Sequence, residues 1–332
     1  MENTQGAAGA GTLSLPPEKY TVGWICAIPT ELNAATAMLD VKHDPLEAQH
    51  KYDENTYQLG SIGKHNVVIA VLPGYGTNNA AVAGKSMQNT FPNLRFGLMV
   101  GVGGGIPSEK NDIRLGDIAV SLPSGQAGGV IQYDMGKRVA GEFIRIGSLD
   151  RPPELLLTAI ATLKARGTRT LGREIMELVS GAFQDEDDEE DDDEDNPVFR
   201  FPEKLTDTLY EDDDSSWGTG GSDNIKERKE RASQNPRCFY GNIGSGNSVI
   251  KNARERRALA ADGDLICFEM EAAGLMNFFK CIVIRGICDY ADKYKHKKWQ
   301  PYAAAVAAAY AKKLLSVISA GAVEKMERIK SE

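Results

Sequence analysis

The stretch YTVGWICAIPTELNAATAML, residues 20–39, places an apolar run directly before an alanine-rich segment that contains a carboxylate. Residues 21–28 have the uninterrupted apolar character of a buried strand, and residues 31–40 have the composition of a helix. Glu31 is the first acid after the strand. An acid at this place is either an ordinary helix-start residue, favoured by the helix dipole, or part of a site at the edge of the sheet. The stretch alone leaves both readings open.

The same strand-then-helix order recurs along the chain. Further strands are predicted at 56–62, 66–72, 96–102, 116–121, 264–270 and 281–288, and further helices near 78–90, 154–165, 248–260, 271–279 and 301–320. Alternation of this kind is typical of an α/β protein with a mainly parallel sheet. The 332 residues, 42% of them hydrophobic, are enough to bury a sizeable core.

Three segments fall outside this pattern. Residues 1–19 are small and polar, and we expect a flexible N-terminal tail; residues 323–332 are expected to form a C-terminal tail. Residues 183–235 contain the run DEDDEEDDDED at 185–195 and the charged segment IKERKER at 225–231. Such a composition cannot offset its ordering entropy by burial, so it predicts a disordered insertion. Pairing of the acidic run with the basic segment, or regulation by a partner, are the alternatives.

Composition sets limits on compartment and partners. The formal charge of −9 comes from the acidic run, since the rest of the chain is slightly positive, so it says nothing about binding partners. Five cysteines without a C-x-x-C pair indicate reduced thiols. No leader and no long apolar stretch is evident. We expect a soluble, cytoplasmic protein that binds a small molecule and neither nucleic acid nor a membrane.

The glycine-rich segment GVGGGIP, residues 101–107, is not a nucleotide fingerprint. A dinucleotide motif needs glycine where Ile106 stands, and a P-loop needs Gly-Lys followed by Ser or Thr. What remains is a strand end that a ligand can approach closely, or a tight turn made for packing. The four histidines lack metal-ligand spacing, and GSGNS at 244–248 has no histidine in a comparable setting. No metal site is predicted.

Carboxylates follow several predicted strands. Glu31 follows the first, Glu269 and Glu271 lie at the end of the 264–270 strand, and Asp289 ends the 281–288 strand. Open α/β sheets bind ligands beyond the carboxyl ends of their strands. Each acid alone could be a helix cap, but several acids at one edge favour a functional site.

Five motifs carry a resemblance to a known family. They are AIPTE, GVGGGI followed by RLGDIAVS, GSGNSVI, EMEAAG and IRGICDYAD. In this order and spacing they resemble the nucleoside phosphorylase and nucleosidase superfamily, most closely its methylthioadenosine/S-adenosylhomocysteine nucleosidase-like branch, over about residues 20–180 and 237–320. The resemblance implies one domain over 20–322 with a three-layer α/β/α fold around a mixed, partly barrel-like sheet. It also implies a homo-oligomer, such as a dimer, and no cofactor.

The resemblance implies cleavage of a purine N-ribosidic bond. Asp289 matches the acid that protonates the purine at N7, and Glu31 matches the base that activates water on the opposite face of C1′. Glu271 matches the carboxylate that binds the ribose hydroxyls, Met270 packs on the sugar, and Glu269 is auxiliary. Asp292 is expected to be structural. The remaining substrate-binding positions implied are Val102, Gly103, Val249 and Ile250.

Water is favoured over phosphate as the attacking group. Phosphorylases of this superfamily hold phosphate with arginines and a serine, whereas this chain has Met99 and Val102 on the strand and no cation in residues 27–39. Nucleosidases also commonly have serine where Val102 stands, which is a departure. The sequence therefore predicts a purine nucleosidase acting on adenosine-type nucleosides. An adenine-nucleotide nucleosidase, a phosphate-dependent purine nucleoside phosphorylase and a non-catalytic nucleoside-binding protein are the alternatives.

Overall fold

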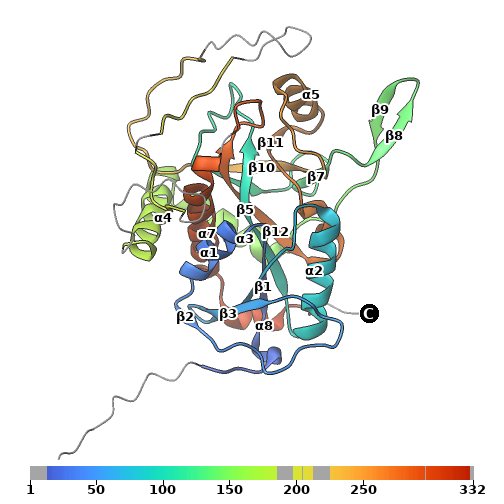
Figure 1. Cartoon of the computed structure of the whole chain (residues 1–332), viewed down its shortest axis with the longest axis vertical. Coiled ribbons are helices and arrows are strands. Elements are labelled where there is room, and N and C mark those ends of the chain that lie inside the picture. The colour runs from blue at the N-terminus through green and yellow to red at the C-terminus, as the bar shows by residue number, and fades with distance from the viewer. Residues whose placement is uncertain (1–12, 185–196, 204, 212–224, 296, 330–332) are drawn as a thin grey trace, which may run out of the picture.

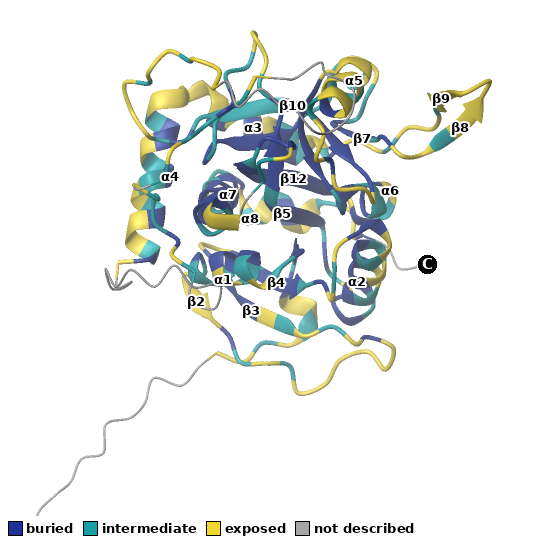
Figure 2. Cartoon of the chain, turned by 45° about the horizontal axis from the view of Figure 1, so that its top comes forward, coloured by how far each residue is buried: buried dark blue, intermediate teal, exposed yellow. Residues whose placement is uncertain are grey.

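Three layers make up the protein, with helices on both sides of one mixed sheet (Figures 1 and 2). The structure is a computed structural model that describes residues 13–184, 197–203, 205–211, 225–295 and 297–329. None of the helices within these ranges is both long and apolar enough to cross a bilayer. The predicted three-layer α/β/α class with a barrel-like sheet is confirmed.

The central sheet has the strand order β11-β10-β6-β12-β5-β1-β4-β3-β2, with β7 paired to β10. Its strands are β1 Val22–Cys26, β2 Val41–Lys42, β3 Tyr57–Ile62, β4 His65–Val71, β5 Phe96–Gly105, β6 Ile118–Ser121, β7 Val130–Gln132, β10 Cys238–Ser245, β11 Leu265–Glu269 and β12 Cys281–Asp289.

One pairing closes part of this sheet into a barrel. The end of β5 also pairs with β11, with Gly105 opposite Cys267 and Gly104 opposite Phe268. Strands β5, β12, β6, β10 and β11 therefore form a closed ring, and β1, β4, β3 and β2 extend from it. A side chain on Gly103 would collide with the Cys267 sulfur, so the bare backbone of GVGGG allows β5 and β11 to approach.

Helices cover both faces of the sheet (Figure 2). One face carries α1 Pro29–Ala37, α3 Glu154–Ala165, α4 Thr168–Ala182 and α7 Gln300–Ser316, and the other carries α2 Thr77–Thr90 and α6 Met276–Phe279. The alanine-rich α7 is buried along most of its length against β12 and β5. Its small side chains permit this approach, and Gly286 faces the Ala303 carbonyl so closely that a Cβ would overlap it.

Several elements were not predicted. Strand β10 has a small and polar sequence, CFYGNIGS, that hides its strand character, and α4 was obscured by the charged composition that follows it. Helix α5, Ala253–Gly263, begins later than expected because Asn252 caps it. The hairpin of β8 Gly136–Val139 and β9 Glu142–Arg145 projects from the body and is largely exposed (Figure 2).

Both expected tails are shorter than predicted. At the N-terminal side, Leu13 bridges to His43 and Pro17–Lys19 forms a 3-10 helix. At the C-terminal side, α8 Ala320–Lys325 packs through Val323, and Ile329 is buried with its N–H bonded to the Leu94 carbonyl. The N-terminal side is therefore joined to the fold by backbone pairing, and the C-terminal side by buried apolar side chains together with a backbone hydrogen bond.

The insertion also differs from the expectation of disorder wherever it is described. Phe199 stacks on Phe183 with ring centroids 4.6 Å apart, and Leu209 is buried. The basic segment pairs with the body of the fold, since Arg231 binds Asp117 at 2.7 Å. The acidic run 185–195 lies outside the described residues, so the alternative that it pairs with the basic segment is untested.

Candidate active site

Glu31 lies where both interpretations of the sequence place it, near the start of a helix and at the edge of the sheet. It is the third residue of α1, and one carboxylate oxygen accepts the N–H groups of Ala27 at 2.6 Å and Ile28 at 3.3 Å. The other oxygen accepts the Val102 N–H at 2.8 Å, on β5. Gly101 leaves the space that the carboxylate occupies, because a Cβ there would overlap it. The acid thus caps its own helix and is held at the carboxyl end of the neighbouring strand.

Glu269 and Glu271 stand at the end of β11. Glu269 accepts the backbone N–H groups of Glu271 at 3.0 Å and Ala272 at 2.9 Å. Glu271 accepts the Gly76 N–H at 3.4 Å, which ties it to the start of α2. Both are almost fully buried. The predicted sugar-binding motif is therefore folded tightly against the sheet.

Arg285 gathers these acids and was not singled out from the sequence. Its guanidinium is 1% exposed, forms a short ion pair with Glu269 and lies 3.1 Å from Glu271 and 4.0 Å from Glu31. It also donates to the Val102 carbonyl at 3.3 Å. An arginine inside the apolar strand CIVIRGIC was the available signal, because a buried charge needs charged partners.

This cluster contains more acidic than basic groups. Three carboxylates face one guanidinium, so they cannot all ionise without leaving uncompensated buried charge. Burial raises the pKa of Glu31 above its ordinary 4.5, against the opposing effect of Arg285. Burial also raises the pKa of Glu271, to about 7, and the neighbouring carboxylates add to the shift. Glu31 and Glu271 therefore have pKa values above those of exposed glutamates.

Asp289 ends β12 and stands apart from the cluster. A bulge in β12 precedes it, and its side chain lies against Gly104, three residues along β5 from the Gly101 that adjoins Glu31. At strand spacing this is about 10 Å along β5. Asp289 accepts the Ala291 N–H at 2.8 Å and lies 3.2 Å from the Lys295 ammonium. Lys295 is a second site residue that sequence reasoning missed.

The other predicted residues have mixed surroundings. Ile250 is buried against Phe268 in a small apolar cluster, whereas Val249 is 50% exposed. Met270 and Val102 are half-buried, and Gly103 is buried. Asp292 accepts the Tyr294 N–H at 2.9 Å and lies 3.8 Å from Arg256. These are contacts within its own loop and with α5, consistent with a structural role.

No metal centre is apparent in the described ranges: no group of three or more histidine, cysteine or carboxylate side chains is placed to hold an ion. The cysteines in these ranges are unpaired thiols. The ionisable side chains described at the site are its buried carboxylates, Arg285 and Lys295.

Solved structures of similar architecture include a futalosine hydrolase and methylthioadenosine/S-adenosylhomocysteine nucleosidases. Futalosine hydrolase of Helicobacter pylori matches with a TM-score of 0.57 and 15% identity, covering 90% of this chain and 98% of that one. The 5′-methylthioadenosine/S-adenosylhomocysteine nucleosidase of Neisseria meningitidis, in complex with methylthio-immucillin-A, matches with a TM-score of 0.56 and 15% identity, covering 89% and 98%. A mutant of the 5′-methylthioadenosine/S-adenosylhomocysteine nucleosidase of H. pylori, with 5′-methylthioadenosine in its active site, matches with a TM-score of 0.57 and 13% identity. That match covers 90% of this chain and 98% of the mutant. The chain shares the fold of these enzymes, which is the fold that the sequence motifs implied.

A relative closer in sequence has a different kind of name. It is a nucleotide-binding leucine-rich repeat (NLR)-like protein of Hyaloscypha variabilis, 67% identical over 325 residues. The match covers 98% of this chain, and the chain spans about a third of that protein, 32% of its length. No family model matches the chain.

Proposed function

We propose that the protein is a purine nucleosidase, which hydrolyses the N-ribosidic bond to release a free base and ribose. One observation carries the proposal: a buried acid, Glu31, and a second carboxylate, Asp289, both lie beside the glycine-rich end of β5, next to Gly101 and Gly104 respectively. The ribosyl purine is proposed to bind at this end of the strand, between the two carboxylates. The nucleosidase structures that share the fold support this reading.

In the proposed reaction the two carboxylates have opposite tasks. Glu31 takes a proton from water as the water oxygen bonds to C1′, and its raised pKa suits a general base. The C1′–N9 bond breaks, its electron pair moves into the purine, and Asp289 gives a proton to N7. Glu271 accepts hydrogen bonds from the ribose hydroxyls, with Arg285 positioning Glu269 and Glu271. Because water and the purine occupy opposite faces of C1′, a β-nucleoside gives α-ribose first.

The charge of the cluster favours water over phosphate. Arg285 is the cation closest to Glu31 among the described contacts, and its guanidinium is already shared between carboxylates. Met99, at a position where phosphorylases place a polar group, is fully buried in the core. A phosphate dianion beside Glu31 would face the net negative charge of these described side chains, whereas water needs only a base.

Adenosine-type nucleosides remain our first choice of substrate, and an adenine nucleotide is the second. One observation favours the second: Lys295 lies 3.2 Å from Asp289 in a loop that also carries Lys293, and Lys297 and Lys298 begin the 3-10 helix Lys297–Trp299 that follows. A loop of lysines beside the site is suited to a phosphorylated ligand.

Within a longer protein like the NLR-like relative, we propose that this chain is the nucleosidase module. A cytoplasmic location and assembly as a homodimer also remain predictions.

Product analysis tests the proposal. The protein is incubated with adenosine, inosine, AMP, ATP and methylthioadenosine, with and without phosphate, and the products are separated by chromatography. We expect free base and an unphosphorylated C1 on the sugar product in phosphate-free buffer. Formation of ribose 1-phosphate that depends on added phosphate would show a phosphorylase. Ligand binding without base release from any of the five would show a binding protein.

A further inference from the structure

The described part of the insertion reaches the loop that carries Asp289. We define the strap as residues 205–211 and 225–231. Its two halves are joined by the Lys226 N–H, which donates to the Leu209 carbonyl at 2.8 Å, and by a bridge between Tyr210 and Ile225. Leu209 is buried. The strap is therefore an ordered part of the fold that touches other elements at defined points.

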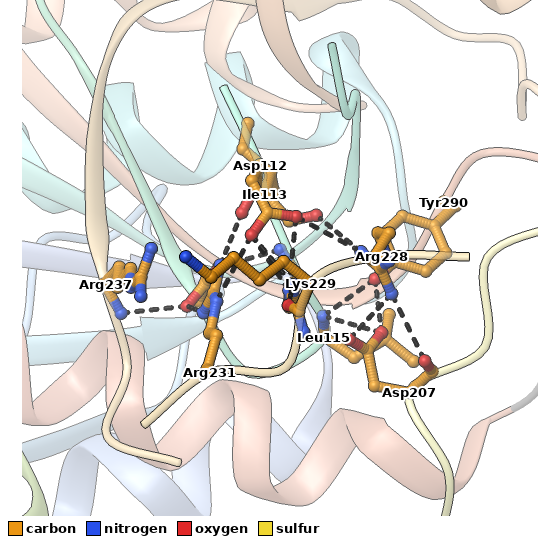
Figure 3. A network of polar contacts seen from close by, with 11 residues as sticks. Asp112, Ile113, Leu115, Asp207, Arg228, Lys229, Arg231, Arg237 and Tyr290 are labelled. Carbon is orange, nitrogen blue, oxygen red and sulfur yellow. Dashed lines mark hydrogen bonds and ion pairs between the residues drawn. The ribbon is translucent and has the colours of Figure 1, made fainter. Parts of the chain in front are cut away.

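Tyr290, the neighbour of Asp289, is the main point of contact (Figure 3). Its hydroxyl forms a short hydrogen bond to Asp207 and accepts the Leu115 N–H at 3.2 Å. Arg228 lies over the Tyr290 ring, 5.4 Å from the centroid, and pairs with Asp207 at 2.7 Å. Tyr290 is 3% exposed. The ring and hydroxyl are thus held from two sides by the strap.

A second contact lies four residues further along the same loop. Tyr210 of the strap stacks on Tyr294, with centroids 3.7 Å apart and the planes 22° from parallel. Helix α5 adds a third support, because Arg256 donates to the Tyr290 carbonyl at 2.5 Å. The loop from Asp289 to Tyr294 is therefore held at both ends by the strap.

The loop needs such support because its backbone is strained. Ala291 has a φ of +51°, a left-handed conformation that a residue with a Cβ rarely adopts. In this conformation its N–H donates to Asp289 at 2.8 Å. Strained backbone persists only where the surrounding structure holds it. The orientation of the Asp289 carboxylate therefore depends on contacts outside the loop.

We propose that Asp207 and Arg228 are positioning residues for Asp289: through Tyr290 they hold the loop in the conformation that aims the acid at the leaving base. The inference rests on the proposed function, since it gives Asp289 the task of leaving-group acid. It assigns the insertion a part in base release that its sequence composition did not suggest. Neither residue is expected to touch the substrate.

Two substrates separate positioning of the acid from general damage. A purine needs protonation to leave, whereas 4-nitrophenol leaves readily as an anion, so 4-nitrophenyl β-D-riboside needs Glu31 but not Asp289. In Arg228→Gln and Tyr290→Phe we expect kcat for the purine nucleoside to fall by about tenfold or more, with KM nearly unchanged, and the nitrophenyl riboside rate to stay within about twofold.

Arg231→Gln is the matched control. Arg231 lies in the same segment and has the same 11% side-chain exposure as Arg228, but it binds Asp117 and Asp112 rather than the loop. It should lower stability and leave the ratio of the two rates unchanged. Equal losses on both substrates in Arg228→Gln, or a ratio shifted as strongly by Arg231→Gln, would overturn the positioning role.

Hydrogen exchange gives a readout that does not depend on activity. The Ala291 N–H should exchange faster in Arg228→Gln and Tyr290→Phe than in the wild type, and at the wild-type rate in Arg231→Gln. Unchanged exchange in all three variants would overturn the strap's hold on the loop. Absence of base release by the wild type, with the exchange still responding, would instead overturn the proposed function and leave the strap contact standing.

Discussion

At the scale of single residues, the site is a set of buried acids organised by one arginine. Glu269 and Glu271 share the Arg285 guanidinium, and Glu31 lies 4.0 Å from it. Removing a partner from such a buried ion pair is costly because it leaves a charge without compensation. The cluster therefore keeps Glu31, the proposed base, and Glu271, the proposed ribose ligand, in fixed positions, whereas Asp289 is held separately by Lys295 and the Ala291 N–H.

Asp289→Asn tests the acid. The amide cannot deliver a proton to N7, so kcat for a purine nucleoside should fall by on the order of a hundredfold or more. Steady-state kinetics measure the loss, and thermal unfolding checks that the fold is retained. Near-normal turnover in a folded variant would remove Asp289 from this role.

Glu31→Gln tests the base. The amide keeps an oxygen that can accept hydrogen bonds from Ala27 or Val102 but cannot take a proton from water, so hydrolysis should collapse. Binding of the nucleoside, measured by calorimetry, should persist within about tenfold. If binding and hydrolysis are lost together, Glu31 has a structural task instead.

Parts of this site could be predicted from the sequence, and the reason is chemical. Glu31, Glu271 and Asp289 stand out because several acids follow apolar strands, and open α/β sheets bind ligands beyond the carboxyl ends of their strands. Arg285 lies within a strand, where pattern reasoning assigns residues to the core, and Lys295 lies in a polar loop without periodicity. Their roles depend on which strands become neighbours, and that information is not local.

At the scale of elements, close packing between β12 and α7 keeps Arg285 and Asp289 in place. Gly286 lies between Arg285 and Ile287, and a Cβ there would overlap the Ala303 carbonyl of α7. The alanines of α7 and Gly286 of β12 are all small, and this allows the helix and the strand to pack at a short distance. The helix and the strand could both be predicted from the sequence, but the distance between them could not.

Gly286→Ala should destabilise the protein by about 3 kcal/mol or more, because the backbone of α7 must move to admit the methyl group. Chemical denaturation measures the change in the free energy of unfolding. Gly181→Ala in α4 is the control, since a Cβ there meets nothing within 4 Å. It should be neutral or stabilise by up to about 1 kcal/mol. Equal effects from the two substitutions would contradict the packing argument.

The insertion shows where reasoning from composition fails. Its charged residues predicted disorder, yet Arg228 and Arg231 find aspartate partners and Phe199 finds an aromatic one. A charged segment orders when the body of the fold supplies complementary charges. Asp112 and Asp117, the partners of Arg231, lie more than a hundred residues away in the chain, so local composition could not reveal them. The closest aspartate to Arg228 is Asp207, within the insertion itself.

At the scale of the whole molecule, buried acids make stability depend on pH. The folded pKa of Glu271 is raised from 4.5 to about 7, so the folded state binds this proton more tightly than the unfolded state does. Its contribution to stability is complete below pH 4.5 and is lost as the pH rises through about 7. His43, whose pKa is lowered by burial, acts in the opposite direction, because its contribution is lost as the pH falls.

Comparison with Glu271→Gln isolates the effect of this acid, because the variant keeps His43. The free energy of unfolding of the wild type should exceed that of the variant by more at pH 5 than at pH 8, with the two differences separated by up to roughly 3 kcal/mol. Denaturant titrations at the two pH values measure it. A difference that is the same at both would show that Glu271 is ionised throughout.

The complete fold could be predicted from the sequence motifs, whereas hydrophobic periodicity predicted only its class. Alternating strands and helices indicated an α/β protein, but the closure of β5 on β11 depends on a pairing between residues 104–105 and 267–268. That closure brings the ends of β5, β11 and β12 to one place, where the proposed nucleoside would lie. The central claim is therefore geometric: an acid and a base act on opposite faces of one ribose.

The stereochemistry of the product tests this claim most directly. A β-purine nucleoside is hydrolysed in phosphate-free buffer while proton NMR follows the anomeric signals before mutarotation equilibrates them. If Glu31 directs water to the face opposite the purine, α-ribose forms first and the β-anomer follows. Initial β-ribose, or no ribose at all, would contradict the arrangement proposed for Glu31 and Asp289.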